Sequence, residues 1–200
     1  MKTFCASLLF LLCFTSSYCQ NHWQLKKDTN GIKIYIRSIP DSNFNEYKAN
    51  TTLNTSLRTV LQELLSAPKY NANTAKSGVS YYVKQIAENQ HLFYVKKDLP
   101  WPLKDRDIIT LLTVKTLDDN STKLTLEALP TALSEHKNTV RIKTLMGYWL
   151  LENQNNKTKI TQQLFLNPEG TIPPFVSNLL LVKGPFNTFL ALKKLEKQNT

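Results

Sequence analysis

The residues that could support catalysis are scattered along this 200-residue chain. The three histidines, His22, His91 and His136, lie far apart in the sequence and lack the spacing of metal ligands. No Gly-x-Ser-x-Gly motif marks a serine nucleophile, and no glycine-rich loop could cradle a phosphate. Glu127 and Arg141 could serve as an acid and a positioning cation in a small-molecule cyclase or hydrolase, although many other pairs would fit as well. We therefore predict a protein that is not an enzyme and uses no metal or cofactor.

Two neighbouring features could instead contact a ligand at the edge of a binding site. Trp101 lies between two prolines, in a stiff loop where an aromatic side chain suits either a membrane interface or a protein core. Arg106 lies between two aspartates, so it either meets a headgroup or forms an ion pair that fixes the start of the next strand. We assign Trp101 and Arg106 to a gate or rim.

The first 19 residues have the features of a secretory signal peptide: a basic start, an apolar run from Phe4 to Phe14 and small side chains near its end. The run is too short to span a bilayer, which needs about 20 residues. We expect residues 1–19 to be removed and residues 20–200 to form one exported domain, periplasmic or extracellular. Cys5, Cys13 and Cys19 all lie in the leader, so that domain can form no disulfide. Lipid modification of Cys19 is the alternative to its removal.

The charge of the chain is strongly basic but dispersed. The formal net charge is +10, and no block of five basic residues occurs. Such a surface provides solubility and can attract an anionic membrane for transient contact, an attraction that salt would weaken. Export argues against nucleic acid as a partner, and we expect a monomer.

The hydrophobic periodicity predicts an α+β fold with an antiparallel sheet. Residues 22–25 suggest a short helix, and the apolar spacing at 57–65 predicts an amphipathic helix that ends before Pro68. Strands are expected at 32–37, 44–53, 79–87, 91–97, 107–117, 123–129, 140–151 and 159–166. The apolar pattern from 175 onward predicts a long C-terminal helix that Gly184 and Pro185 kink or divide. A sheet of about eight strands must curl, and this helix is the apolar element left to cover its concave side.

A cavity between the curved sheet and the helix would be the natural ligand site. We assign the ligand-binding wall to apolar residues on the presumed inner side of the sheet and to one residue of the closing helix: Tyr82, Tyr94, Leu112, Val114, Leu126, Met146 and Phe189. Periodicity cannot distinguish a lined cavity from a filled core, because both need the same residue types. A structural or partner-binding module with a filled core therefore remains an alternative.

Several segments, taken in order, resemble a known family. They are 31–37 (GIKIYIR), 99–107 (LPWPLKDRD), 140–142 (VRI), 147–151 (GYWLL) and 167–178 (NPEGTIPPFVSN). The chain is similar in these segments to START domains (StAR-related lipid transfer), as an exported, bacterial-type member. The resemblance implies a helix-grip fold, in which the sheet wraps around the C-terminal helix, and a lipid or sterol-like ligand. Leu112 stands where some sterol-binding members have an arginine, so a sterol specificity does not carry over.

Overall fold

The computed structural model describes residues 22–198 with the exception of 72–74, 171, 174–175 and 177–178. The predicted signal peptide, its cleavage site and the three cysteines lie outside the described residues. The same holds for Phe175, where the predicted C-terminal helix begins.

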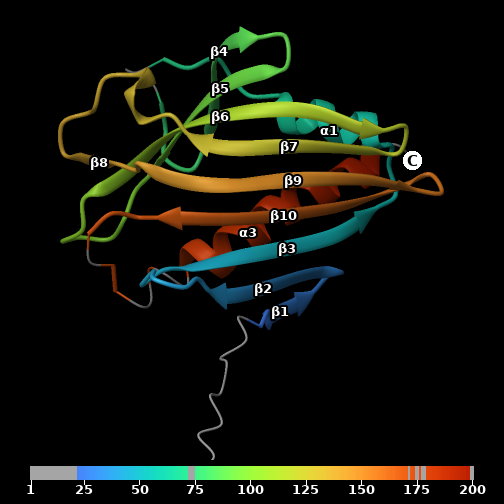
Figure 1. The fold of residues 1–200 in the computed structure, drawn as a ribbon, viewed down its shortest axis with the longest axis horizontal. Coiled ribbons are helices and arrows are strands. Elements are labelled where there is room, and N and C mark those ends of the chain that lie inside the picture. The colour runs from blue at the N-terminus through green and yellow to red at the C-terminus, as the bar shows by residue number, and fades with distance from the viewer. Residues whose placement is uncertain (1–21, 72–74, 171, 174–175, 177–178, 199–200) are drawn as a thin grey trace, which may run out of the picture.

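A ten-stranded sheet dominates the molecule (Figure 1). Its strands are β1 (Gln24–Thr29), β2 (Ile32–Ser38), β3 (Asn45–Leu53), β4 (Ser80–Ala87), β5 (Gln90–Lys97), β6 (Asp105–Asp118), β7 (Ser121–Ala128), β8 (Thr139–Arg141), β9 (Thr144–Gln154) and β10 (Lys157–Asn167). The spatial order is β1-β2-β3-β10-β9-β7-β6-β5-β4, with antiparallel neighbours, and β8 adds a short parallel pairing to β6. The predicted α+β class and antiparallel sheet are confirmed.

Two expectations about the strands are wrong in detail. Residues 22–25 do not form a helix, because Gln24 and Leu25 pair with β2 as the start of the edge strand β1. The predicted strand 140–151 is two strands, because Arg141 in β8 pairs with Asp107 of β6 while β9 starts at Thr144 and pairs with β7 and β10. These two additional strands raise the count from about eight to ten.

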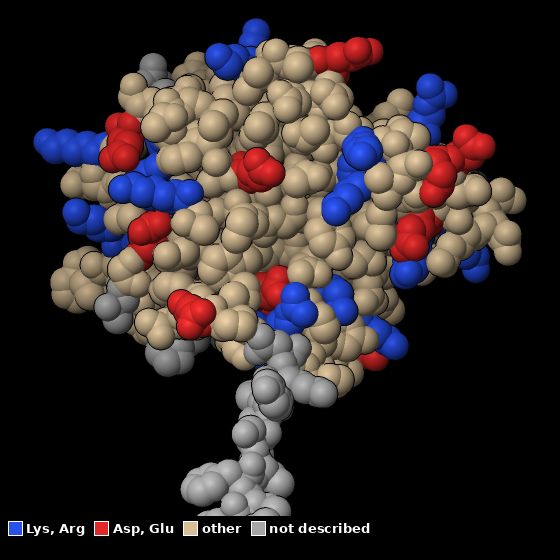
Figure 2. Space-filling view, viewed as in Figure 1, with Lys and Arg blue, Asp and Glu red and all other residues tan. Residues whose placement is uncertain are grey.

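The two faces of the sheet differ in composition. The inner face is apolar, since alternate residues of the central strands, such as Ala49, Leu124, Leu151 and Ile160, are fully buried in one core. The outer face carries positively charged lysine and arginine side chains and negatively charged carboxylates, intermixed over the surface (Figure 2). The alternation along each strand therefore turns one side of the sheet toward the helices and leaves the other to solvent.

A second, smaller cluster covers part of the outer face near β4, β5 and β6. Tyr94 packs there with Tyr81 and Ile109, and its ring lies 4.5 Å from that of Tyr70. The hydroxyl of Tyr70 is 2.9 Å from Nε2 of His136, which ties the loop after α1 to the loop before β8. This cluster explains why β5 and β6 are apolar on both faces.

The predicted amphipathic helix is confirmed as α1 (Leu57–Leu65). Ser56 caps it, because its hydroxyl accepts a hydrogen bond from the backbone N–H of Thr59 at 3.1 Å. Val60 is its buried anchor against the inner face of the sheet. The helix ends at Leu65, and Pro68 follows after a short non-helical link.

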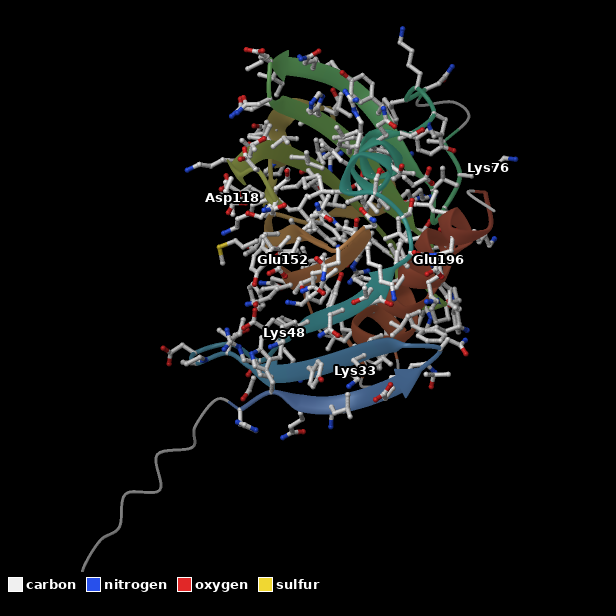
Figure 3. The ribbon with its side chains drawn as sticks, turned by 90° about the vertical axis from the view of Figure 1, so that its right-hand side faces the viewer. Lys33, Lys48, Lys76, Asp118, Glu152 and Glu196 are labelled. Atoms are coloured by element: carbon white, nitrogen blue, oxygen red, sulfur yellow. The ribbon has the colours of Figure 1, made fainter. Side chains whose placement is uncertain are left out.

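The C-terminal helical segment lies in the concave side of the curved sheet (Figure 3). It consists of a π-helical turn, η2 (Leu179–Lys183), then α3 (Gly184–Leu192) and a 3-10 turn, η3 (Lys193–Gln198). The change from π to α geometry occurs at Gly184, where the sequence predicted that Gly184 and Pro185 would interrupt the helix. Pro185 has no backbone N–H to donate to a helical hydrogen bond. Glu196 accepts a hydrogen bond from the backbone N–H of Asn54 at 2.9 Å, so the end of the segment is tied to the loop before α1. In the described part of the chain, no helix combines the length and the hydrophobicity that spanning a bilayer requires.

Candidate functional site

A pocket of about 610 Å³ lies between the inner face of the sheet and the helical segment η2–α3. Its sheet wall is largely apolar and includes Val95, Ile108, Leu164 and Leu166. The opposite wall is formed by Leu180 and Leu181 of η2 and by residues of α3. The residues of α3 that border it are mostly small: Gly184, Thr188 and Ala191 recur at helical spacing on one side of the helix. The pocket therefore exists where the helix presents little side-chain volume to the sheet.

One end of the space between sheet and helix is closed by aromatic packing. The rings of Trp149 on β9 and Phe189 on α3 stack with their centroids 5.5 Å apart and an angle of 21° between their planes. Phe189 is fully buried. Next to Trp149 on the inner face, Gly147 has no room for a side chain, because a Cβ there would lie 2.3 Å from the carbonyl oxygen of Gln163. This half of the concave face is solid.

A pair of polar side chains lies inside the otherwise apolar wall. The hydroxyl of Tyr47 on β3 donates a hydrogen bond of 2.8 Å to Oε1 of Gln162 on β10. Each of the two residues is only 7% exposed. Burial raises the pKa of the Tyr47 phenol above its usual range, so the hydroxyl keeps its proton and stays a donor.

Arg106 lies at the other end of the pocket and holds the backbone around it. Its Nε donates to the carbonyl oxygen of Pro168 at 3.0 Å, and its terminal nitrogens donate to the carbonyl oxygens of Glu169 (3.1 Å) and Lys104. These bonds connect the start of β6 to the turn after β10, whose residues Glu169 and Gly170 both have positive φ. Arg106 thus positions the turn that leads toward the helical segment.

Asp107, the neighbour of Arg106, has a different partner. Arg141 of β8 donates to both carboxylate oxygens of Asp107, from Nε at 2.8 Å and from a terminal nitrogen at 3.0 Å. The remaining donors of Arg141 bond the carbonyl oxygens of Pro130, Leu133 and Ser134, so all five of its N–H groups have partners. An Arg141 occupied in this way has no donor left for a substrate, and Glu127 is exposed on the outer face of the sheet, away from the pocket. The structure does not bring this pair together as an acid and a clamp.

Asp105, the aspartate on the other side of Arg106, has partners of its own. Asp105 forms an ion pair with Lys96 at 3.0 Å and accepts a hydrogen bond from the backbone N–H of Leu99. The three consecutive charges of the sequence therefore have three different sets of partners: a lysine, a turn and a buried arginine. In this arrangement they fix the strand and its flanking loops, and Arg106 and Asp107 also border the pocket.

The predicted ligand-binding residues separate into two groups. Tyr82, Leu112, Val114, Leu126 and Phe189 belong to the inner core, but none of them borders the pocket. Tyr94 and Met146 are on the wrong face: Tyr94 packs in the outer cluster, and Met146 is 57% exposed.

Strand register explains the two errors. Tyr82 lies opposite Phe93, so Tyr94 points to the other side of β5. Irregularities in β4 shift the pairing of β4 with β5, and the alternation of the sequence does not predict such shifts. In β9 the inward residues are the odd-numbered ones, such as Leu145 and Trp149, which places Met146 outside.

The two predicted rim residues also differ. Arg106 borders the pocket, whereas Trp101 does not and is 92% exposed. The loop that carries Trp101 nonetheless connects Leu99 to Arg106, both of which line the pocket. A gating role for either residue remains a prediction.

Sequence reasoning missed Tyr47 and Gln162. A signal was present, because Gln162 stands at the inward position between Ile160 and Leu164 in a strand that was correctly predicted. A polar residue at a strand position that points to the buried face indicates a hydrogen-bonded or functional side chain. Among the described residues, no cluster of three or more His, Cys, Asp or Glu side chains could hold a metal ion.

Comparison with known proteins gives consistent results. No family model matches the chain. A STAR-related lipid transfer protein from Xanthomonas axonopodis has a similar structure, with a TM-score of 0.75 and 28% identity over 88% of this chain and 98% of that one. Human StAR-related lipid transfer protein 5 has a TM-score of 0.68 at 16% identity, covering 88% of this chain and 86% of that one.

Two sequence relatives point the same way. Human phosphatidylcholine transfer protein is 27% identical over 171 residues, covering 81% of this chain and 78% of that protein. The uncharacterized protein PA1579 of Pseudomonas aeruginosa is 29% identical over 182 residues, covering 86% of this chain and 85% of that protein. The resemblance to START domains and the predicted helix-grip fold are confirmed.

Proposed function

Because the chain has the START fold, we propose that it is a non-enzymatic carrier that binds one hydrophobic molecule between the sheet and α3. The observation that carries this proposal is the pocket of about 610 Å³ with its largely apolar wall. Transfer of apolar surface from water would drive binding, at roughly 25 cal/mol per Å² removed from water. The names of its relatives support the ligand class, since they include a STAR-related lipid transfer protein and a phosphatidylcholine transfer protein.

In this proposal one wall of the pocket moves to admit the ligand. The change of helix geometry at Gly184 divides the helical segment, so η2 and its apolar side chains can lift while α3 stays packed through Phe189. The exposed Trp101 on the loop between two pocket-lining residues is suited to contact a membrane interface at that moment. In this proposal η2 is the gate and the loop around Trp101 is its membrane contact.

The formal net charge of +10, or +9 once Lys2 leaves with the predicted leader (10 − 1), favours transient docking to an anionic membrane. Attraction between dispersed surface charges is screened within about 10 Å at 0.1 M salt. We expect transfer between vesicles that contain anionic lipid to slow as salt rises, and transfer that does not respond to salt would remove this part of the proposal. The proposed site of action is outside the cytoplasm, in the periplasm or extracellular space, following the predicted leader.

Native mass spectrometry of protein purified from its host tests the binding proposal. A co-purified lipid-sized molecule in a 1:1 complex is the expected result. Leu166→Phe, which adds volume inside the pocket, should lower its occupancy. Leu150→Phe makes the same change on β9, whose residue 150 faces away from the pocket, and should leave occupancy unchanged.

Two results would contradict the carrier. Protein that carries no molecule and takes up none from vesicles would favour a module with a filled interior. Turnover of a candidate substrate that is lost on changing Glu127 or Arg141, in variants that still melt at the original temperature, would favour an enzyme.

A further inference from the structure

Gln162 is a buried amide surrounded by apolar groups on the pocket wall. Its neighbours along the inner face of β10 are Ile160 and Leu164, and its partners in register on the adjacent strands are Trp149 and Ala49. It borders the pocket although it is only 7% exposed. A carboxamide in such surroundings costs free energy unless its hydrogen bonds are made.

Among the described residues, the hydrogen bonds of this amide are only partly made. A glutamine side chain has two N–H donors and an oxygen that accepts two bonds. Tyr47 uses one acceptor position, and within the described part of the chain Nε2 has no hydrogen-bond partner. No fully enclosed side-chain nitrogen or oxygen of the described residues lacks a partner, so Nε2 keeps some exposure, and the pocket is the open space that Gln162 borders. If the amide were turned round, Oε1 would take that place, and a polar atom would still point into the pocket.

The charged residues of the pocket lie at its other end. Arg106 bonds the carbonyl of Pro168, which is six residues beyond Gln162 along the chain. At about 3.3 Å per residue in a strand, the two positions are ~20 Å apart. Asp107 is neutralised by Arg141, and Lys97 lies beside Arg106 in the register of β5 and β6. An anionic group next to Gln162 would therefore be buried without a cation, which is strongly unfavourable, whereas an uncharged hydroxyl or carbonyl would be hydrogen-bonded.

The volume limits the size of the ligand. A space of about 610 Å³ holds about 20 methylene-sized groups if each takes ~30 Å³, the share of one water molecule in the liquid. One long chain or a compact ring system fills this volume, and two acyl chains with a headgroup would extend beyond it. The stacked rings of Trp149 and Phe189 do not border the pocket, and Trp149 lies in register beside Gln162.

We infer that Gln162 and Tyr47 form a polar anchor that binds the uncharged hydroxyl or carbonyl group of a single-chain or compact-ring amphiphile. The ligand enters with this group first, and its apolar body fills the space between Gln162 and the turn held by Arg106. Nε2 of Gln162 donates to the ligand oxygen, and a ligand hydroxyl can donate in turn to the phenol oxygen of Tyr47. This inference rests on the proposed carrier function and narrows its ligand class.

The test compares three single-chain probes on the purified protein and on a variant without the anchor. The probes are hexadecanol, hexadecane and palmitate, delivered from cyclodextrin and measured by native mass spectrometry. The double variant Tyr47→Phe with Gln162→Leu removes both polar groups together, which leaves no unpaired partner. Gln162→Met, which keeps Tyr47, is a second variant in case the first does not fold, and thermal melting checks both.

The expected result is selective. Removing the anchor lowers the affinity for hexadecanol about 5- to 10-fold, because one hydrogen bond is lost. The affinities for hexadecane and palmitate change by less than about twofold. Equal changes for hexadecanol and hexadecane would overturn the anchor while leaving the carrier function intact. A loss for palmitate as large as for hexadecanol would overturn the preference for an uncharged group. A tight 1:1 complex with phosphatidylcholine from vesicles would overturn the size limit, and a protein that binds none of these probes would overturn the carrier proposal itself.

Discussion

The two halves of the concave face use the same strand pattern and reach opposite results. In one half, Trp149 stacks on Phe189, and the space between sheet and helix is full. In the other half, Leu164 and Leu166 continue the same alternation on β10, yet their side chains border a pocket. The difference comes from α3, which presents Phe189 to the first half and Gly184, Thr188 and Ala191 to the second. The sheet thus supplies an apolar surface everywhere, and the volume of the helix side chains decides where that surface stays uncovered.

The largest expected difference between the halves concerns Phe189. Phe189→Ala removes a fully buried ring from the packed half and should lower the free energy of unfolding by about 3–5 kcal/mol. Urea denaturation followed by circular dichroism measures this loss. A cost below about 1 kcal/mol would mean that this half is as loosely packed as the other.

Adding volume should distinguish the halves with opposite effects. Ile160→Phe, at a fully buried position of β10, should cost about 1–3 kcal/mol because the ring has no free space. Ala191→Phe, on the pocket side of α3, should leave the stability nearly unchanged and lower ligand occupancy, because its ring can extend into open volume. Denaturation and native mass spectrometry on the same samples measure both effects, and equal destabilisation by the two changes would contradict an open pocket.

Removing volume from the pocket wall should have a small effect. Leu166→Ala takes away a half-buried side chain that already borders empty space, so the expected loss is about 1 kcal/mol, below the 2–5 kcal/mol typical of enclosed leucines. A decrease in the free energy of unfolding as large as that of Phe189→Ala would show that Leu166 is packed on all sides and does not border empty space.

The smallest expected effect on stability belongs to Trp101. Because Trp101 is 92% exposed, Trp101→Ala should change the free energy of unfolding by less than about 0.5 kcal/mol. If the loop is the membrane contact, the same variant should transfer ligand between vesicles more slowly. His22→Ala, at another exposed position, is the control, and unchanged transfer by Trp101→Ala would separate this loop from the membrane step.

The sequence was sufficient for most of the fold because the alternation and helical spacing of long elements are strong signals. α1 and the strands of the hairpins β4–β5 and β6–β7 lie where the pattern predicted them. The start of β1 was predicted to be a helix at 22–25, because four residues do not define a period. Register was harder to predict, since a one-residue error moves a side chain to the other face. Met146 and Tyr94 were assigned to the inner face for that reason.

The candidate site was harder to predict than the fold. Its position depends on which helix residues are small and which are large, and this comparison involves two elements far apart in the chain. Gln162 and Tyr47 meet across β10 and β3, and their hydrogen bond joins residues 115 positions apart. Arg106 was found because its motif is local, but two of its three carbonyl partners, Pro168 and Glu169, become visible only when the turn after β10 is placed beside it.

Gly147 has a consequence for anyone who wishes to redesign this protein. Since even a methyl group at this position would collide with the backbone of β10, the spacing of these two strands is set by the main chain and cannot be adjusted by mutation there. Saturation libraries that aim at new cargo should therefore keep this glycine fixed. Diversity introduced at 188 and 191 on α3 would reshape the chamber without disturbing the sheet that holds it.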